Sequence, residues 1–477
     1  MSESALPVAH RPVRGPVPAL AAFLSFLIPG LGQAYIGRRR LAFILVLPVL
    51  VLLGLAVVGG MTGSATLARA LLAPGVLLGV LVLDIALLGW RLFAIGHAGF
   101  SARRQPGFAN LAVIILLLAA TLVSHLWAGV ILTTADRTLT TIFGHGGQTA
   151  PVSGHLDNQP DSYGWNGTDR INFLLLGYDS APGREEELTD TMMVVSVDPV
   201  THSAAMISVP RDTGFVPLPD RRVYADGLFP VKLNELAATA NADPQRWCPD
   251  LPLGTDCGTR TLSQALGLYL GITIHQVAWI DLLGFASLID ALGGVDLCLP
   301  GRLEDPTYGG PTWYPKVGIV LEAGCAHYDG VHALAFARSR KGIMVMPDGS
   351  VVGQNDYVRA ARQQEVLLAL QAKVRNANLL IDLPALMEAV GRTVSTDMPR
   401  SQAGDLAALA TMIDRESVER VVLGWPDFVN PPVDPLRYYM IIPRRDAIRA
   451  EMARILGTDT SLLGWYLGST AEGPPAS

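Results

Sequence analysis

Residues 171–212 read INFLLLGYDSAPGREEELTDTMMVVSVDPVTHSAAMISVPRD. Three short runs in this stretch, INFLLLGY, TMMVVSV and AAMISV, are apolar at nearly every position, and residues that favour turns separate them. Runs of this kind predict strands that a sheet buries on both of its faces. The stretch therefore predicts neighbouring strands of a sheet that carries helices on both sides.

Strand and helix patterns alternate further along the chain. The other strand patterns are QVAWID, GVDLCLP and RVVLGW, and the helical patterns are residues 262–270, 282–292, 331–337, 358–372, 383–390 and 402–413. This alternation predicts an α/β fold, an α/β/α sandwich with a mixed central sheet and helices on both faces. We expect this domain at residues 169–456, after a polar linker at 133–168 and before a tail at 457–477.

The first third of the chain holds an excess of apolar residues. Leu41–Ala68 carries no charged residue, Ala70–Trp90 carries only Asp84, and Gln105–Ala135 has no Asp, Glu, Lys or Arg. Each segment is long enough to cross about 30 Å of hydrocarbon. We therefore predict three transmembrane helices within residues 41–132. Asp84 would serve a function inside the membrane or form a hydrogen bond to a neighbouring helix.

Basic residues predict the orientation of these helices. Arg38–Arg40 and Arg103–Arg104 stand at helix ends, and Lys and Arg collect on the cytoplasmic side of membranes. The later domain is then extracytoplasmic, in a multi-pass protein of the plasma membrane. Residues 15–37 contain FLIPGLGQAYIG, whose Pro and Gly interrupt it at mid-depth. We expect a re-entrant or interfacial hairpin there, with residues 1–14 in the cytoplasm; a fourth span with an outside N-terminus is the alternative.

All four cysteines lie in the part expected outside the membrane: Cys248, Cys257, Cys298 and Cys325. An even number of cysteines in an extracytoplasmic region predicts disulfides, of which three pairings are possible. We expect Cys248–Cys257, which closes a short loop, and Cys298–Cys325, which joins a strand end to a following turn.

Arginines gather in two neighbouring segments of this domain. Arg338 and Arg340 follow the helical run GVHALAFA, while Arg359 and Arg362 share one face of the helix predicted at NDYVRAARQQEVLLAL. Four arginines this close together, in a chain of net charge -6, indicate a site for phosphate or pyrophosphate. Surface arginines on amphipathic helices are the alternative interpretation.

Polar residues also follow the predicted strands of the first stretch. Asp179 and Asp190 flank the turn between its first two strands, and Arg211 and Asp212 follow the third. Ligands of α/β sheets usually meet the loops at strand ends. Two carboxylates beside phosphate-binding arginines are what Mg²⁺ needs, whereas aspartates that only cap turns are the alternative.

Seven blocks of this sequence, taken in order, resemble the LytR–CpsA–Psr (LCP) family. The blocks are NFLLLGYDS, LTDTMMVVSVDP, MISVPRDT, VKLNELAA, LLGFASLIDALGGVDLCLP, YDGVHALAFARSR and DYVRAARQQEVLLAL. The resemblance covers residues 169–424. The N-terminal SFLIPGLGQAYIGRRR also resembles a segment ahead of some actinobacterial members.

The resemblance implies a phosphotransferase that acts outside the plasma membrane. Its members move a glycopolymer from a polyprenyl-pyrophosphate carrier to peptidoglycan, typically to the 6-hydroxyl of N-acetylmuramic acid, and release polyprenyl phosphate. They hold the polyprenyl tail in an apolar tunnel between sheet and helices. The implied partners are the lipid-linked glycan donor, the peptidoglycan acceptor and membrane lipid. The polymer could be arabinogalactan, teichoic acid or capsule.

Carried over by motif, the resemblance assigns roles to individual residues. The implied catalytic set is Asp179, Asp190, Arg211, Arg338 and Arg340, with Asp179 and Asp190 as ligands of Mg²⁺ or Mn²⁺. The implied pyrophosphate site is Arg211, Arg338, Arg340, Arg359, Arg362 and Gln363. Lys232, Asn234, Asp212 and Arg184 are further candidates. One departure is Leu188, which stands where the family usually has an arginine, so Arg184 is a possible substitute.

Other activities remain open or fit poorly. A module that binds a lipid-linked glycan without transferring it, and a hydrolase that cleaves the pyrophosphate with water, would use the same residues. A nucleic-acid-binding regulator fits poorly, because the chain is acidic and its arginine-bearing domain is expected on the wrong side of the membrane. A transporter also fits poorly, because three or four spans leave little room for inverted repeats.

Overall fold

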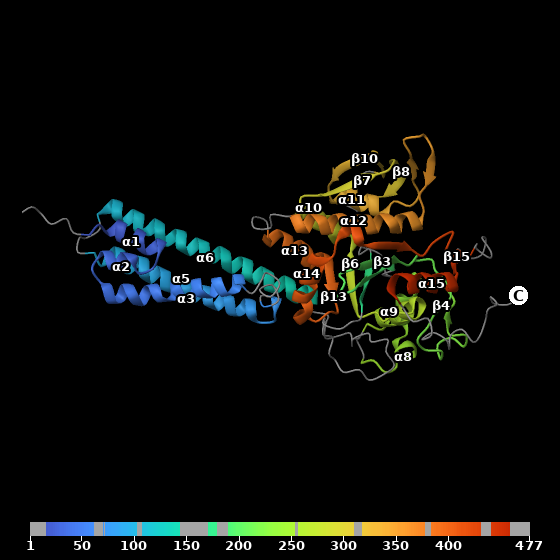
Figure 1. Cartoon of the computed structure of the whole chain (residues 1–477), viewed down its shortest axis with the longest axis horizontal. Coiled ribbons are helices and arrows are strands. Elements are labelled where there is room, and N and C mark those ends of the chain that lie inside the picture. Colours follow the sequence, from blue (N-terminus) through green and yellow to red (C-terminus); the bar gives the residue numbers. More distant parts are fainter. Residues whose placement is uncertain are drawn as a thin grey trace, which may run out of the picture. The chain divides into compact units, whose positions relative to one another are not determined.

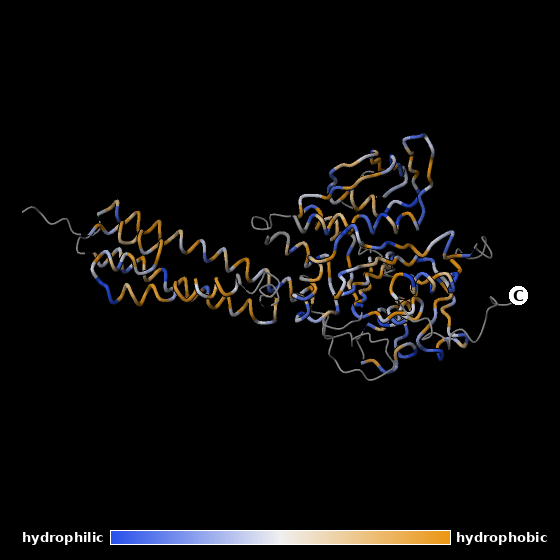
Figure 2. The backbone as a smooth tube through the Cα atoms, viewed as in Figure 1, coloured by the Kyte–Doolittle hydropathy of each residue, from blue (hydrophilic) through white to orange (hydrophobic). Residues whose placement is uncertain are grey.

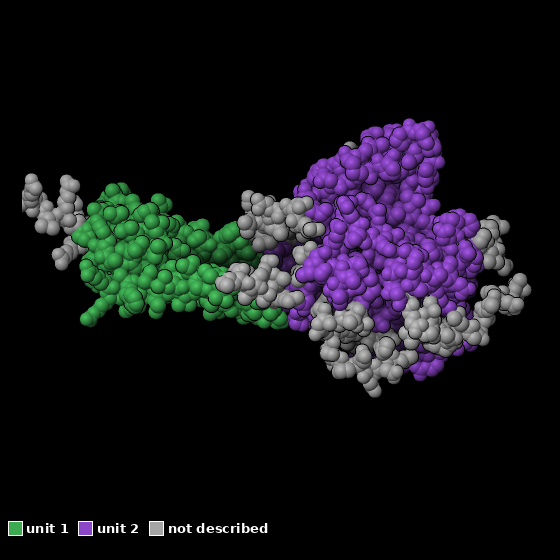
Figure 3. All heavy atoms as spheres, viewed as in Figure 1, with its two compact units in different colours: residues 1–136 green, residues 137–477 purple. Residues whose placement is uncertain are grey.

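The computed structural model describes residues 16–61, 70, 72–102, 107–143, 170–178, 189–252, 256–309, 317–376, 383–430 and 440–457. The chain forms two compact units, residues 1–136 and residues 137–477 (Figure 3). The expected cytoplasmic N-terminus and almost all of the expected tail lie outside the described residues.

Three long apolar helices make up most of the first unit. They are α3 (Arg39–Met61), α5 (Val76–Phe100) and α6 (Phe108–Phe143), and Figure 2 shows that hydrophobic residues predominate in them. Each is long and apolar enough to cross a membrane. Helix α5 continues beyond Trp90, where the predicted apolar segment ends, and the Arg91 guanidinium donates to the carbonyl oxygen of Phe26 at 2.9 Å.

The two ends of α6 belong to different units. Residues 133–143 were expected to begin the linker, but they continue this helix to Phe143. The correction has a packing reason, because the last turns pack within the second unit. Thr138 Oγ1 donates to the carbonyl oxygen of Met387, 3.2 Å away, and its side chain lies against Gly391.

A short helical hairpin packs on α5. Its helices are α1 (Pro18–Leu27) and α2 (Leu31–Tyr35). The buried side chain of Gln33 donates to the carbonyl oxygen of Ala94 on α5 at 2.7 Å. Helix α1 spans about 15 Å, which is half the thickness of a hydrocarbon core. This geometry suits a re-entrant or interfacial hairpin, whose placement in a membrane stays a prediction.

Asp84 has a partner on the neighbouring long helix. Its Oδ1 lies 2.7 Å from Nδ1 of His125 on α6, and both side chains are largely buried. Of the two interpretations that the sequence left open, the structure supports a hydrogen bond between helices.

A mixed sheet of six strands forms the centre of the second unit. Its order is β13 (Val394–Thr396), β6 (Gln276–Asp281), β1 (Ile171–Tyr178), β2 (Thr189–Val197), β3 (Ala204–Ser208) and β14 (Glu419–Val422). Strand β1 is parallel to β6 but antiparallel to β2, and β14 is parallel to β3. The predicted mixed α/β sheet is confirmed.

Helices cover both faces of this sheet. Leu174, Val194 and Ile207 point to one face and share a core with Leu262 of α9 (Cys257–Leu270). Met193 and Met206 point to the other face and pack on Leu368 of α12 (Asp356–Asn376). Figure 1 shows α9 and α12 on opposite sides of the sheet. Burial of alternate side chains on both faces explains why the strands lack polar alternation.

A second core lies beside the central sheet. It packs α10 (Leu282–Ala291), α11 (Gly330–Arg338) and part of α12 against two small sheets. One sheet pairs β7 (Val295–Leu299) with β10 (Gly324–Tyr328); the other has the order β12 (Val351–Gly353), β11 (Ile343–Val345), β8 (Arg302–Gly309) and β9 (Val317–Leu321). The strand predicted at GVDLCLP therefore exists, but it lies outside the central sheet.

The remaining elements complete the second unit, and several of them contribute buried residues to the first core. They are β4 (Val216–Pro217), β5 (Leu228–Phe229), η1 (Leu233–Glu235), α7 (Leu236–Ala242), α8 (Pro244–Trp247), α13 (Leu383–Thr393), η2 (Arg400–Gln402), α14 (Ala403–Met412), η3 (Arg415–Ser417), β15 (Val429–Asn430), β16 (Ile442–Pro443) and α15 (Arg445–Leu456). The helices predicted from sequence correspond to α9 through α14.

The cysteines pair as expected. The sulfur atoms of Cys248 and Cys257 are 2.01 Å apart, and those of Cys298 and Cys325 are 1.99 Å apart. The first disulfide joins α9 to the loop after α8. The second joins β7 to β10, where the two cysteines face each other across the ladder.

Candidate functional site

Asp190 and two arginines meet at one edge of the central sheet. Asp190 is the second residue of β2, and Arg211 lies in the loop after β3, which runs antiparallel to β2. Arg211 Nη1 is 2.6 Å from Asp190 Oδ1, and Arg359 Nη2 on α12 donates to the Asp190 carbonyl oxygen at 3.1 Å. Strands and helix together bring residues that are 169 positions apart into contact.

A second carboxylate, which sequence analysis did not single out, completes this centre. Asp356 Oδ1 lies 3.1 Å from Arg359 Nη2, one helical turn along α12. Burial disfavours the charged form of Arg211, but the negative charges of Asp190, Asp356 and Asp212 outweigh burial and raise the pKa of Arg211. The i,i+3 spacing of Asp356 and Arg359 was a usable signal in the sequence.

Helix α12 also holds the segment that carries Arg338 and Arg340. Arg362 donates to the carbonyl oxygen of Ser339, and its guanidinium lies 5.3 Å from the centre of the Phe336 ring. Gln363 Nε2 donates to the carbonyl oxygen of Ala337 at 3.3 Å. The residues at which α11 ends are therefore fixed against α12 by two side chains of the predicted site.

Asp305 binds Ser339, the residue between Arg338 and Arg340. It is 2% exposed, and its Oδ2 accepts a hydrogen bond from Ser339 Oγ at 2.7 Å. Burial alone would raise the pKa of Asp305, but hydrogen bonds from Ser339 and Thr307 lower it below the usual value. Asp305 is 34 residues from Ser339, so no local pattern in the sequence pointed to it.

Like charges are crowded in this site. Burial lowers the pKa of Arg359, the Asp356 and Asp190 carboxylates oppose this effect, and the positive charges of Arg211 and Arg340 add to it. Burial, followed by the charge of Arg359, lowers the pKa of Arg362 to about 10. With a pKa of about 10, Arg362 remains charged at neutral pH, and the charge of Arg359 repels it. We call Arg211, Arg340, Arg359 and Arg362 the arginine cluster.

Several N–H groups of the arginine cluster are buried without a partner. Within the described ranges, Nε of Arg211, Nε of Arg359, and both Nε and Nη1 of Arg362 form no hydrogen bond. The buried Thr191 Oγ1 is unpaired too. Leaving a buried donor unsatisfied costs about 1–3 kcal/mol. An anion with several oxygen atoms would satisfy these donors and relieve the repulsion, so the arrangement suits phosphate or pyrophosphate.

Three further candidates hold the loop that carries Arg211. Lys232 Nζ is 2.9 Å from Oδ1 of the buried Asp212. The backbone N–H of Asn234 donates to the carbonyl oxygen of Arg211 at 3.1 Å, and the backbone carbonyl oxygen of Asn234 accepts from Thr189 Oγ1. These contacts place Lys232, Asp212 and Asn234 behind the arginine cluster, where they position it.

The structure places the other predicted residues as follows. Arg338 is the half-buried last residue of α11, and Arg340 follows two residues later in extended chain. Asp179, Arg184 and Leu188 lie outside the described residues, so their predicted roles stay predictions.

A metal ion was predicted beside this site. In the part of the chain that the structure describes, no three or more His, Cys, Asp and Glu side chains form a metal-binding group. The donor chemistry still suits Mg²⁺, because Asp190 and Asp356 bring carboxylate oxygens to the arginine cluster and Mg²⁺ often takes only one or two carboxylates together with phosphate oxygens.

Comparison with known proteins shows which proteins this chain is similar to. Residues 138–441 match the model of the LytR_cpsA_psr family. The cell wall biosynthesis protein LcpA of Corynebacterium glutamicum is 30% identical over 50% of this chain and 43% of its own length. The polyisoprenyl-teichoic acid–peptidoglycan teichoic acid transferase TagU of Oceanobacillus iheyensis is 27% identical over 48% of this chain and 59% of its own length.

This chain thus spans about half the length of the curated relatives it matches. Among solved structures, B. subtilis TagV aligns with a TM-score of 0.44 and 20% identity, over 61% of this chain and 99% of that one.

Proposed function

This chain belongs to the LytR_cpsA_psr family, and from that premise we propose that it is a membrane-anchored phosphotransferase. Its reaction would move a glycopolymer from a polyprenyl-pyrophosphate carrier to peptidoglycan, outside the plasma membrane, during cell-wall assembly. The names of LcpA and TagU, which refer to cell-wall biosynthesis and to teichoic acid transfer to peptidoglycan, support this choice of substrate class.

The arginine cluster carries the proposal. Buried guanidinium groups that repel one another and keep unpaired N–H donors are arranged for a highly charged, oxygen-rich ligand. A pyrophosphate diester has such oxygens on both phosphorus atoms. Arginine forks match phosphate geometry and stay charged throughout catalysis, so they are suited to bind this group.

In the proposed reaction, an acceptor hydroxyl oxygen attacks the phosphorus that bears the glycan. The new P–O bond joins glycan phosphate to peptidoglycan, while the bond from this phosphorus to the bridging oxygen breaks. Polyprenyl phosphate leaves with that oxygen, and the hydroxyl proton passes to a base. The arginine cluster would stabilise negative charge on the phosphate oxygens, which is the main requirement of phosphoryl transfer.

Mg²⁺ or Mn²⁺ would be held by Asp190 together with Asp179, as the family resemblance implies. When bound, the ion would neutralise charge on the pyrophosphate oxygens. Arg211 already pairs with Asp190 at 2.6 Å and so fixes the orientation of this carboxylate. Asp356 is a further carboxylate at the site and a candidate to accept the proton.

The three long apolar helices would anchor the protein in the membrane that contains its lipid donor. Membrane attachment would keep the site close to a substrate whose polyprenyl chain stays in the bilayer. It would also leave polyprenyl phosphate there after transfer.

The test uses the full chain in detergent with a polyprenyl-pyrophosphate-linked glycan, peptidoglycan fragments and Mg²⁺. The products measured are polyprenyl phosphate and glycan joined to peptidoglycan. The Asp179→Asn/Asp190→Asn double variant should lose both products. Asp220→Asn is the matched control, because Asp220 pairs with the exposed Arg222 and with no arginine of the cluster, so its loss should leave turnover unchanged.

The products also separate the alternatives. Polyprenyl phosphate together with unattached glycan phosphate would identify a hydrolase. Bound donor with neither product would identify a binding module and overturn the proposal.

A further inference from the structure

Trp425 is a large apolar side chain that the fold leaves open to solvent. It lies in the loop after β14 and is the most exposed Phe, Tyr or Trp side chain in the described part of the second unit, at 57%. It forms no hydrogen bond or ring contact with any described residue. A tryptophan that packs in a core buries a large apolar area, and here that area is available to a ligand.

The strand register places Trp425 at the same edge of the central sheet as the arginine cluster. One row of paired residues crosses three neighbouring strands: Met193 of β2, Ser208 of β3 and Val422 of β14. Asp190, Arg211 and Trp425 each lie three residues beyond this row, at one edge of the sheet. Since neighbouring strands are about 4.8 Å apart, β2 and β14 are separated by about 10 Å.

Contacts within the fold hold the loop that carries Trp425. A Cβ atom at Gly424 would lie 2.4 Å from Cδ1 of Tyr357, so the chain lies directly against α12, one residue after Asp356. The backbone N–H of Phe428 donates to the carbonyl oxygen of Gly424 at 3.0 Å and closes a turn that contains Trp425. Trp425 is therefore fixed beside the residues of the candidate site.

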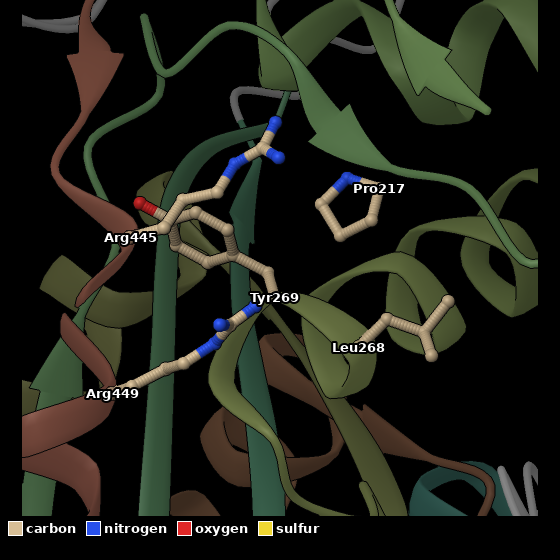
Figure 4. A pocket seen from close by; sticks show the side chains of 5 residues that line it. All are labelled: Pro217, Leu268, Tyr269, Arg445 and Arg449. Atoms are coloured by element: carbon tan, nitrogen blue, oxygen red, sulfur yellow. The ribbon is translucent and has the colours of Figure 1, made fainter. Parts of the chain in front are cut away.

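Exposure separates Trp425 from Tyr269, an aromatic residue of α9 that lines a small pocket with Arg445 and Arg449. Figure 4 shows the two arginine side chains on either side of the Tyr269 ring. Tyr269 is only 6% exposed, so neither face of its ring is open to a ligand. An aromatic ring beside the site with an accessible surface is thus a property of Trp425 and not of Tyr269.

We propose that Trp425 is a stacking platform for a sugar ring next to the bound pyrophosphate. This inference rests on the proposed function and adds a specificity-determining contact to it. Two sugars meet at the reacting phosphorus: the glycan sugar bonded to it through oxygen, and the acceptor sugar that carries the attacking hydroxyl. Both present a face of C–H groups to an indole ring. A phosphate group and one sugar ring bridge the distance from β2 to β14.

The experiment measures equilibrium binding to the full chain in detergent with Mg²⁺ and needs no turnover. The donor probes are farnesyl pyrophosphate and farnesyl-pyrophosphoryl-N-acetylglucosamine, which differ by the sugar alone. The acceptor probe is the disaccharide of N-acetylglucosamine and N-acetylmuramic acid, added to protein saturated with farnesyl pyrophosphate.

We expect Trp425→Ala to weaken binding of one sugar-bearing probe about fivefold or more, because stacking on an aromatic ring is lost. Binding of farnesyl pyrophosphate should not change. The probe that is weakened identifies the sugar as that of the donor or that of the acceptor.

Three variants serve as controls. Trp425→Tyr keeps an aromatic ring and should retain most of the sugar binding, which separates stacking from misfolding. Val200→Ala truncates an apolar side chain that is 63% exposed in the turn between β2 and β3, at the opposite edge of the sheet, and should change nothing. Arg340→Gln should weaken farnesyl pyrophosphate itself, which separates the anion site from the sugar platform.

The proposal is overturned if Trp425→Ala binds both sugar-bearing probes as wild type does. It is also overturned if the variant loses farnesyl pyrophosphate to the same extent, which would assign the ring to the lipid tail or to the fold. The proposed function fails separately: a chain that binds a sugar through Trp425 but transfers nothing would refute the transferase and keep the platform.

Discussion

Two groups of arginines in the second unit differ in how their charges are satisfied. At the surface, Arg415 and Arg420 both pair with Glu365, at 2.9 and 2.6 Å. Arg454 likewise pairs with Glu419 and Glu451. In the arginine cluster, by contrast, Asp190 pairs with Arg211 and Asp356 with Arg359, yet N–H donors of Arg211, Arg359 and Arg362 are buried without a partner.

The comparison shows why counting arginines cannot locate a binding site. Both groups lie on or near α12 and both belong to a charged network. Three glutamates oppose the three surface arginines, whereas Asp190 and Asp356 oppose the four arginines of the cluster. The buried N–H donors of the arginine cluster lack acceptors that an anion would supply, and these unpaired donors indicate a binding site.

The largest expected effect comes from deleting an arginine of the cluster. Arg340→Ala should lower turnover about 10²-fold or more, as loss of a donor to developing negative charge does elsewhere. Arg454→Ala is the matched surface variant and should leave turnover unchanged. Steady-state release of polyprenyl phosphate measures both. Equal rates for the two variants would show that the arginine cluster is no more important for turnover than the surface arginines.

Ligand binding should stabilise only the intact cluster. Inorganic pyrophosphate at about 100 times its Kd should stabilise the protein by about 2.7 kcal/mol, which raises the Tm by several degrees. Arg359→Gln should remove this rise, whereas Arg420→Gln should keep it. Thermal unfolding of the full chain in detergent measures the shift. A rise that survives Arg359→Gln would place the anion elsewhere.

Asp397 is a buried carboxylate whose charged form is disfavoured by burial. Burial raises the pKa of Asp397 to about 6 from 3.8, against the hydrogen bond from the Val277 amide. Its stabilising contribution is thus complete below pH 3.8 and disappears as the pH rises through 6. Full loss would correspond to about 3 kcal/mol, since each pKa unit is about 1.4 kcal/mol.

Asp397→Asn keeps the acceptor for Val277 but removes the titrating charge. Relative to wild type, the variant should therefore gain stability between pH 4.5 and pH 7.5. Thermal unfolding at both pH values measures this. A difference in Tm that does not change with pH would show that Asp397 stays protonated, or stays charged, throughout.

The smallest effect should follow from breaking the surface network. Glu365→Gln leaves Arg415 and Arg420 without their shared carboxylate, and exposed ion pairs contribute about 0–1 kcal/mol. The Tm should fall by at most a few degrees and turnover should not change. A large loss of turnover would mean that the surface network and the arginine cluster are coupled through α12.

The central elements of the fold could be read from the sequence because their signals are local. Continuous apolar runs in β1, β2 and β3 reflect burial on both faces, and the helical period marked α9 through α14. The small sheets were harder to predict. Strands β11 and β12 have three residues each, too few to show a period, and Val351 and Val352 of β12 are apolar but exposed.

The candidate site was predictable only in part for the same reason. Arg359 and Arg362 share a helix face, so their spacing alone indicated a joint site. Asp305 acts through Ser339, and nothing local in the sequence marks a carboxylate that lies 34 residues from its partner.

By itself, the sequence determined which segments are apolar enough for a membrane, which strands are buried and which residues carry the charge. These properties depend on side-chain chemistry and on periods of two or 3.6 residues, which the chain displays directly. Only the tertiary structure decided which charges are satisfied. Glu365 pairs with Arg415 and Arg420 and Asp305 fixes Ser339, while donors of Arg211, Arg359 and Arg362 are buried unpaired. Whether a charge or a hydrogen-bond donor has a partner depends on distance and burial, and the fold determines both.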